Sequence, residues 1–243
     1  MKLSKHAVIQ LKNLYRTKKK EILYRLKQFG KIRSDGSDEE IFTELAFCIL
    51  TPQSKAKYCW DAIVKLGDKK VLFRGDTEKI KEGLRYVRFK NKKAVYIVKA
   101  RESFLSSSHS SEHPPFPPLP KGGVGGLNNG EWKGFSIKSI LSKFNDVNKL
   151  REWLVDNIKG IGYKEASHFL RNIGFGEKIA ILDRHILRNL FELGLIKEIP
   201  QSISRERYMQ IEKIMAEFAR EVDIPISHLD LLLWYKETGE IFK

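Results

Sequence analysis

Residues 158–166 read Ile158-Lys159-Gly160-Ile161-Gly162-Tyr163-Lys164-Glu165-Ala166. Apolar residues recur at helical spacing in residues 147–158, before the two glycines, and again in residues 163–173, after them. Asp146 suits the N-cap of the first helix, and Gly174 suits the end of the second. The pattern therefore predicts a helix, a four-residue turn and a second helix.

The glycines of this turn suit a phosphate-binding site. Neither Gly160 nor Gly162 carries a Cβ atom, so a DNA phosphate can approach the backbone closely. The unpaired N–H groups that open the second helix favour an anion at the same place. A Gly-x-Gly turn alone is weak evidence, because most such turns only connect helices.

Two further side chains add chemistry to the turn. Lys164 stands in the first turn of the second helix, and a carboxylate follows at Asp183. The positive end of the helix disfavours the ammonium form of Lys164, and a nucleophilic amine must be unprotonated. Such an amine could attack C1′ of a deoxyribose, expel the base and leave a Schiff base, while Asp183 stabilises the positive charge on the sugar. The simpler alternatives are a phosphate contact for Lys164 and a helix N-cap for Asp183.

The combination of hairpin, lysine and aspartate resembles the helix-hairpin-helix DNA glycosylase superfamily. Three flanking segments are similar to the compact 8-oxoguanine DNA glycosylase/lyase family of archaea and some bacteria, namely Phe42-Thr43-Glu44-Leu45-Ala46-Phe47-Cys48-Ile49-Leu50-Thr51-Pro52-Gln53, Val87-Arg88-Phe89-Lys90-Asn91-Lys92-Lys93-Ala94 and Leu232-Leu233-Trp234-Tyr235-Lys236-Glu237-Thr238-Gly239. The resemblance covers nearly the whole chain except about residues 105–133. It implies two helical lobes with an active-site cleft between them, lobe one from about 1–50 plus 186–243 and lobe two from about 51–185.

The resemblance also implies roles in base recognition. An enzyme that acts on a base in duplex DNA must take that base out of the stack. Gln53 would fill the vacated site or face the estranged cytosine, Arg88 would contact DNA, and Phe89 and Trp234 would sandwich the base. The carboxylate of Lys243 would accept the N7–H that distinguishes 8-oxoguanine from guanine. Without the resemblance, Gln53 is equally well a helix-end or surface amide, and the aromatic side chains suit a core.

The composition favours a polyanionic partner. Among the 243 residues, 45 are Lys or Arg and 30 are Asp or Glu, which gives a formal charge of +15. The basic residues occur in short groups along the chain, as on a folded surface. We find no apolar run long enough to span a membrane and no secretory signal, and we therefore expect a cytoplasmic, monomeric protein that binds double-stranded DNA containing oxidised guanine.

Metal-binding patterns are absent from the sequence. The two cysteines, Cys48 and Cys59, cannot hold the four-cysteine iron–sulfur cluster of the endonuclease III type, and they suit buried free thiols. The six histidines form no spaced ligand set. We expect no metal and no cofactor, except that backbone carbonyls at the hairpin turn could bind a monovalent cation.

Helical periodicity dominates the rest of the chain and predicts an all-α fold. We expect helices over 37–50, 54–66, 77–86, 90–103, 137–144, 179–193, 204–222 and 225–238. Residues 106–133 differ, because Ser, Pro and Gly predominate there. We interpret them as a low-complexity inserted loop, with a proline-rich ligand for a partner as the alternative.

These observations predict a bifunctional glycosylase and AP lyase that excises 8-oxoguanine through a lysine Schiff base and cuts the strand 3′ to the lesion. One alternative is a related enzyme for oxidised pyrimidines, which the missing cluster cysteines and the segment from Trp234 to Lys243 disfavour. The other is a non-catalytic helix-hairpin-helix DNA-binding protein, which would leave the pairing of Lys164 with Asp183 unexplained.

Overall fold

The computed structural model describes residues 5–105 and 137–243, and within these ranges the chain is helical with no strand. The insertion expected at 106–133 lies outside the described residues. The elements in order are α1 (Lys5–Asp35), α2 (Asp38–Leu50), α3 (Ala56–Asp68), α4 (Val71–Arg74), α5 (Thr77–Gly83), α6 (Lys90–Leu105), α7 (Ile137–Leu141), α8 (Val147–Asn157), α9 (Tyr163–Leu170), the π-helical turn η2 (Arg171–Phe175), the 3-10 turn η3 (Gly176–Lys178), α10 (Arg184–Glu192), α11 (Arg205–Glu221) and α12 (Ile226–Thr238). The predicted all-α fold is confirmed.

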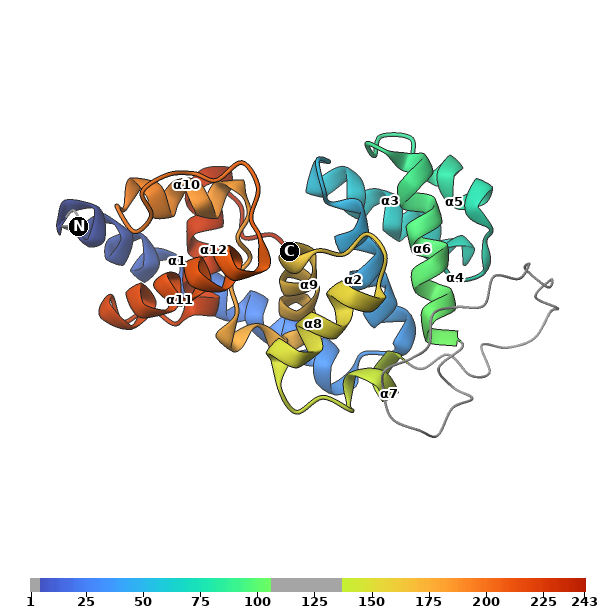
Figure 1. Cartoon of the computed structure of the whole chain (residues 1–243), viewed down its shortest axis with the longest axis horizontal. Coiled ribbons are helices and arrows are strands. Elements are labelled where there is room, and N and C mark those ends of the chain that lie inside the picture. Colours follow the sequence, from blue (N-terminus) through green and yellow to red (C-terminus); the bar gives the residue numbers. More distant parts are fainter. Residues whose placement is uncertain (1–4, 106–136) are drawn as a thin grey trace.

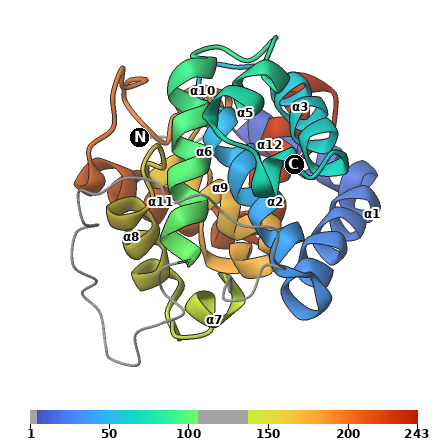
Figure 2. The ribbon, with the colours of Figure 1, turned by 90° about the vertical axis from the view of Figure 1, so that its right-hand side faces the viewer.

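Two hydrophobic cores divide the molecule into two lobes (Figure 1). One core gathers buried side chains from α2 to η3 and defines lobe two. The other gathers side chains from the first part of α1 and from α10, α11 and α12, and it defines lobe one. Viewed onto lobe two, α6 lies in front with α5 and α3 on one side and α8 on the other (Figure 2).

Helix α2 lies in the core of lobe two. We expected residues 1–50 to belong to lobe one, but the buried side chains of α2 from Ile41 to Leu50 pack with α3, α6 and α9. Almost every residue of α2 after its first turn is buried, and only a central position in a core accommodates such a helix. Lobe two therefore begins at α2, and α1 alone carries the amino-terminal part of lobe one.

Helix α1 is the longest element and was missing from the predicted helices. Its buried residues in lobe one are Leu11, Tyr15 and Ile22, which recur at intervals of four and seven residues. The other end of α1 packs along η2, where Arg33 donates to the carbonyl oxygen of Gly174 at 3.4 Å. Because it contacts both lobes, α1 fixes their relative position.

The segment 179–182 also departs from expectation. A helix was predicted from Ile179 to Leu193, but α10 begins only at Arg184 and Asp183 is its N-cap. Residues 179–182 carry no helix, and their N–H groups from Ala180 to Leu182 bond to buried side chains instead. Asp183 consequently lies at the end of a segment held from the protein interior.

Candidate active site

The predicted helix–turn–helix is present as α8, residues 158–162 and α9. Asp146 caps α8 by accepting hydrogen bonds from the N–H groups of Asn148 and Lys149 at 2.7 and 3.1 Å. Gly160 has a φ of +90°, and a Cβ atom there would meet the ring of Tyr96 at 2.4 Å. The turn therefore requires glycine at 160 for its backbone conformation and for its packing against α6.

Lys164 is the second residue of α9, and its side chain is 30% exposed. Its ammonium lies 3.1 Å from Oε1 of Glu165, whose Oε2 accepts a hydrogen bond from the N–H of Gly162 at 3.2 Å. Glu165 thus holds both the hairpin turn and the predicted nucleophile. We did not single it out from the sequence, although Glu three residues after an N-cap is a signal for capping.

Asp183 is the N-cap of α10 in lobe one. Its carboxylate accepts a hydrogen bond from the N–H of Ile186 at 2.8 Å, as an N-cap does. Burial raises the pKa of Asp183, while that hydrogen bond and the nearby Lys164 ammonium act in the opposite direction. Lys164 thus lies within range for its charge to act on the Asp183 carboxyl, and the capping role that was the simpler alternative for Asp183 is present as well.

His168 lies one turn after Lys164 and is buried. Its ring packs edge-on against Phe47 at 5.5 Å between centroids. Burial lowers the pKa of His168 well below its ordinary value, helped by the charges of Arg171 and Lys164. The imidazole is consequently uncharged at neutral pH and adds no positive charge one turn after Lys164.

Trp234 lies on α12 in lobe one, and its indole ring packs edge-on against His185 at 5.0 Å between centroids. Its Nε1 atom is buried and has no hydrogen-bond partner among the described residues. The ring is partly buried, and one indole donor remains available. A role for Trp234 in holding a base stays a prediction.

Lys243 is docked into lobe two. Its ammonium pairs with Glu44 and lies 3.2 Å from the centroid of the Trp60 ring. Burial lowers the pKa of Lys243, and the Glu44 carboxylate acts against this shift. The neighbouring Phe242 ring packs against Phe47 at 6.4 Å. The side chain of Lys243 thus packs at the edge of the lobe-two core, which the sequence did not indicate. Recognition of N7–H by Lys243 stays a prediction.

Gln53, Arg88 and Phe89 lie on two adjoining turns of lobe two. Gln53 and Phe89 are exposed and have φ values of +54° and +59°, which non-glycine residues rarely adopt. The two turns are joined by Ser54, whose hydroxyl accepts from the N–H of Arg88 at 3.1 Å. Backbone strain of this kind is found where surrounding contacts enforce it, often at functional sites.

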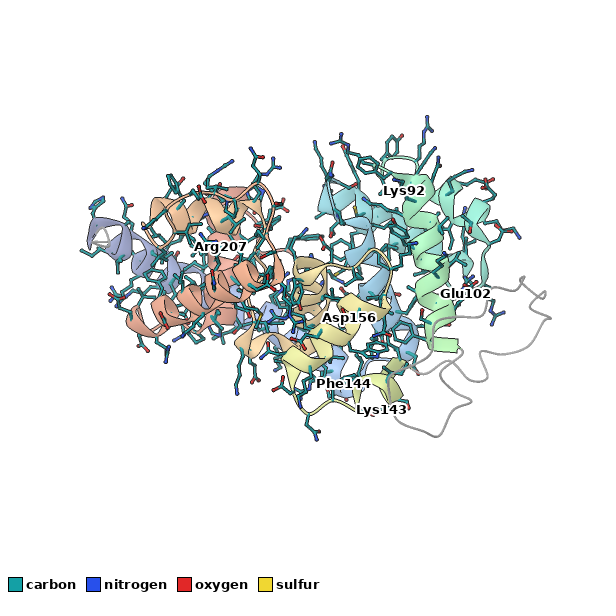
Figure 3. The ribbon with its side chains drawn as sticks, viewed as in Figure 1. Lys92, Glu102, Lys143, Phe144, Asp156 and Arg207 are labelled. Atoms are coloured by element: carbon teal, nitrogen blue, oxygen red, sulfur yellow. The ribbon has the colours of Figure 1, made fainter. Side chains whose placement is uncertain are left out.

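The buried ammonium of Lys93 enforces this arrangement. It donates to the carbonyl oxygens of Leu50 and Pro52, both at 2.7 Å, and to the hydroxyl of Ser54 at 3.0 Å. Lys93 is only 4% exposed, and burial lowers its pKa. The sequence contains Lys93 in a basic segment, and nothing local distinguishes it from its exposed neighbours Lys92 and Lys90 (Figure 3).

Phe89 and Trp234 belong to different lobes, and no contact between them is present in the described part of the chain. The base sandwich predicted for them stays a prediction. A pocket of about 500 Å³ is lined by α1 side chains from Tyr24 to Ile32 and by Lys243. Neither Lys164 nor Asp183 lines it, and the cleft expected between the lobes also stays a prediction.

A family model described as 8-oxoguanine DNA glycosylase matches residues 22–224. The chain belongs to this family. The 8-oxoguanine DNA glycosylase/AP lyase of Fusobacterium nucleatum is 42% identical over 234 residues, which cover 96% of each protein. Family membership confirms the resemblance stated from the hairpin, lysine and aspartate.

Solved structures of relatives share the whole fold. The 8-oxoguanine DNA glycosylase of Thermotoga maritima aligns with a TM-score of 0.78 and 32% identity, covering 97% of this chain and 98% of that one. The Methanocaldococcus jannaschii 8-oxoguanine glycosylase/lyase, in complex with a 15mer DNA containing 8-oxoguanine, aligns with a TM-score of 0.77 and 36% identity, covering 97% and 100%. The two-lobed arrangement therefore belongs to the family.

The described residues offer neither a metal-binding cluster nor a membrane-spanning helix. No group of three or more His, Cys, Asp or Glu side chains is placed to hold a metal ion in residues 5–105 and 137–243. Cys48 and Cys59 are free and buried. Within the same ranges, no helix is both long and apolar enough to cross a membrane.

Proposed function

We propose that this protein excises 8-oxoguanine from double-stranded DNA and then cleaves the strand as an AP lyase. Relatives described as 8-oxoguanine DNA glycosylase/AP lyase match nearly the full chain, and one related structure contains DNA with 8-oxoguanine. The observation that carries the chemistry is that Lys164, from the hairpin of lobe two, lies near enough for its charge to act on the Asp183 carboxyl, from lobe one. A DNA-binding module needs the hairpin glycines but has no use for this pair.

The reaction begins with attack of the unprotonated Lys164 amine on C1′ of the flipped nucleotide. The bond between C1′ and the base breaks as the N–C1′ bond forms, and the base leaves with the electron pair and takes up a proton. The Asp183 carboxylate stabilises the cationic character of the sugar in the transition state. Its burial strengthens this effect, because the surroundings of a buried charge screen it poorly.

Strand cleavage uses the same lysine. Opening of the sugar ring gives a Schiff base between Lys164 and C1′, which acidifies the proton on C2′. A base removes that proton, the electron pair forms the C2′–C3′ double bond, and the bond from C3′ to the phosphate oxygen breaks. Glu165, Asp183 or water can carry the protons, and hydrolysis of the imine returns free Lys164.

The remaining residues serve DNA binding and base recognition in this proposal. The hairpin N–H groups around Gly160 and Gly162 bind a phosphate, with a monovalent cation at the turn carbonyls as a further proposal. Gln53 and Arg88 occupy the strained turns that face the duplex. The flipped base is recognised by Phe89, Trp234 and Lys243, which come into contact with it when both lobes bind the DNA. We expect a monomer acting on DNA in the cytoplasm.

Lys164→Gln tests the proposal. The variant should lose borohydride trapping on DNA with an abasic site and should lose strand cleavage, because a carboxamide forms no Schiff base. Its affinity for the lesion duplex should remain within about threefold, since phosphate contacts supply most of the affinity. Lys213→Gln, at an exposed position of α11, removes the same charge and should trap normally. Normal trapping by Lys164→Gln would exclude this lysine as the nucleophile.

A matched set of duplexes separates the substrate classes. Otherwise identical duplexes carrying 8-oxoguanine, thymine glycol or uracil are cleaved in parallel under single-turnover conditions. We expect excision of 8-oxoguanine to be fastest by a large factor. Faster excision of thymine glycol would favour the enzyme for oxidised pyrimidines, and binding without excision of any base would favour the non-catalytic module.

A further inference from the structure

The segment that carries Asp183 is held by buried side chains. Its three N–H groups before Asp183 each donate to one of them, Ala180 to Oε1 of Glu212 at 2.8 Å, Ile181 to Oδ1 of Asp230 at 3.0 Å, and Leu182 to the hydroxyl of Tyr208 at 3.2 Å. These side chains supply the partners that a neighbouring strand would supply in a sheet. The position of Asp183 therefore depends on groups in α11 and α12.

The Tyr208 hydroxyl makes the most contacts with this segment. It donates to the carbonyl oxygen of Ala180 at 2.7 Å and accepts from the N–H of Leu182. It also lies 3.1 Å from the hydroxyl of Ser167. A phenol has one proton and two lone pairs, so these three contacts use its full capacity when Ser167 donates. Tyr208 is 2% exposed, and burial raises its pKa, so the hydroxyl keeps its proton.

Ser167 connects this hydroxyl to the nucleophile. It lies on α9 three residues after Lys164, on the same side of the helix, and is fully buried. Its hydroxyl also accepts from Nη1 of Arg151 at 3.1 Å, and Arg151 pairs with Glu212 at 2.7 Å. The Tyr208 oxygen is thus in direct contact with the helix that carries Lys164 and with the segment that carries Asp183.

We propose that Tyr208 is a positioning residue whose hydroxyl sets the Asp183 carboxylate relative to the Lys164 amine. The inference rests on the proposed function, since it assigns a task to the support of that pair. Asp183 follows Leu182 directly, and its own N–H donates to Ile181 at 2.8 Å, so a shift of the segment moves the carboxylate. Small misplacements of reacting groups lower rates by factors of up to about 100.

The test is Tyr208→Phe, which keeps the ring and removes only the hydroxyl. We expect the single-turnover rate of 8-oxoguanine excision at saturating protein to fall by about 10- to 100-fold. The Kd for the lesion duplex should change by less than about twofold, because no phosphate contact is touched. Rates are normalised to the fraction of protein that circular dichroism shows to be folded.

Tyr15→Phe is the matched control. Tyr15 is also buried in the core of lobe one, and its hydroxyl lies 2.7 Å from Nδ1 of His228. Unlike Tyr208, Tyr15 makes no hydrogen bond to residues 180–182 in the described part of the chain. The same atom is removed from the same core, so this variant should lower the melting temperature and leave the excision rate unchanged. An equal loss of rate in both variants would show a general effect of core stability and overturn the proposal.

A double-mutant cycle separates positioning from structural support. In the Asp183→Asn background, Tyr208→Phe should cause no further loss of rate, because its effect passes through the carboxylate. Multiplied losses would overturn the proposal. An Asp183→Asn variant with the normal rate would instead overturn the proposed function, and the inference with it.

Ser167→Ala provides a second variant if Tyr208→Phe does not fold. It removes the contact from the α9 side and leaves the hydrogen bonds of Tyr208 to Ala180 and Leu182 in place. We expect a smaller loss of excision rate, about 3- to 10-fold, that is again absent in the Asp183→Asn background. An unchanged rate in Ser167→Ala would show that the link through Tyr208 does not position the pair.

Discussion

Asp183 combines two roles at one carboxyl group. It caps α10 by accepting a hydrogen bond from the N–H of Ile186, and its pKa responds to the charge of the Lys164 ammonium. Asparagine is about as good an N-cap as aspartate, so Asp183→Asn removes the charge and keeps the cap. This substitution therefore separates catalysis from helix stability at a single residue.

Asp183→Asn should lower the rate of 8-oxoguanine excision by about 100-fold or more, as loss of a positioned electrostatic group does. Because burial raises the pKa of Asp183, its carboxyl protonates at a higher pH than an ordinary aspartate, and kcat/KM should fall as the pH drops through this raised pKa. The variant should lack this acid limb. Excision assays from pH 4 to pH 8 measure both effects, and an acid limb retained by the variant would assign it to another group.

Local signals explain which site residues the sequence could predict. Lys164 follows a Gly-x-Gly turn and Asp183 precedes an apolar helix, so both are recognisable within a few residues. Tyr208 and Lys93 act through partners 26 to 43 residues away in sequence. An aromatic residue inside a helix and a lysine in a basic segment have no local mark of such contacts, and only the folded chain identifies them.

At the level of elements, helix boundaries with a chemical cap were predictable. The cap expected at Asp146 is present, and the helix expected over 37–50 begins with a capping box formed by Ser37 and Glu40. The predicted helix 179–193 was wrong in its first turn, because residues 180–182 find better partners in buried side chains than in a helix. Tertiary contacts of this kind override local propensity.

The turn at Gln53 is an element whose conformation depends on one cation. The Lys93 ammonium donates hydrogen bonds to three oxygen atoms at the end of α2 and in the turn, and the Ser54 hydroxyl in turn bonds the N–H of Arg88. The positive φ values of Gln53 and Phe89 are costly, by about 1–2 kcal/mol each, so the turns need such a restraint. Removal of the ammonium should release both turns together.

Lys93→Met should therefore lower the free energy of unfolding by about 2–4 kcal/mol, since it leaves buried acceptors unpaired. Affinity for the lesion duplex should also fall, by about 10-fold, because Gln53 and Arg88 lose their fixed positions. Chemical denaturation and fluorescence anisotropy measure the two effects. Lys99→Met, at an exposed position of the same helix, is the control and should change neither. Undiminished affinity in Lys93→Met would show that the turns are not part of the DNA contact.

Across the whole molecule, buried polar groups form a continuous chain between the lobes. It runs from the N–H of Ile181 through Asp230 and Arg171 to Asn172, and from Asn172 through Glu44 to Lys243. Arg171 lies in η2 beside the core of lobe two, and Asp230 lies on α12 in lobe one. The lobes are thus joined by specific charged contacts as well as by α1, and the segment that carries Asp183 is connected through them to Lys243.

The ion pair of Arg171 with Asp230 is a buried contact between the lobes. Its atoms lie 2.7 Å apart, and both side chains are almost fully buried. Removing one partner leaves a buried charge without compensation, so Arg171→Met or Asp230→Asn should each destabilise the protein by about 3–5 kcal/mol. The double variant should cost less than the sum of the two, with a coupling energy of about 1–3 kcal/mol.

Arg205 and Glu152 provide a comparison at the same junction, since this pair also joins α11 of lobe one to α8 of lobe two. Both of its side chains are exposed, 56% and 38%, so solvent screens the interaction and a coupling energy of about 0–1 kcal/mol is expected. Urea denaturation of the two cycles measures both couplings in one protein. Similar values for the buried and the exposed pair would mean that burial of Arg171 and Asp230 adds nothing to the contact between the lobes. A large coupling confined to Arg171 and Asp230 would show that a buried ion pair helps to hold together the two lobes that carry Lys164 and Asp183.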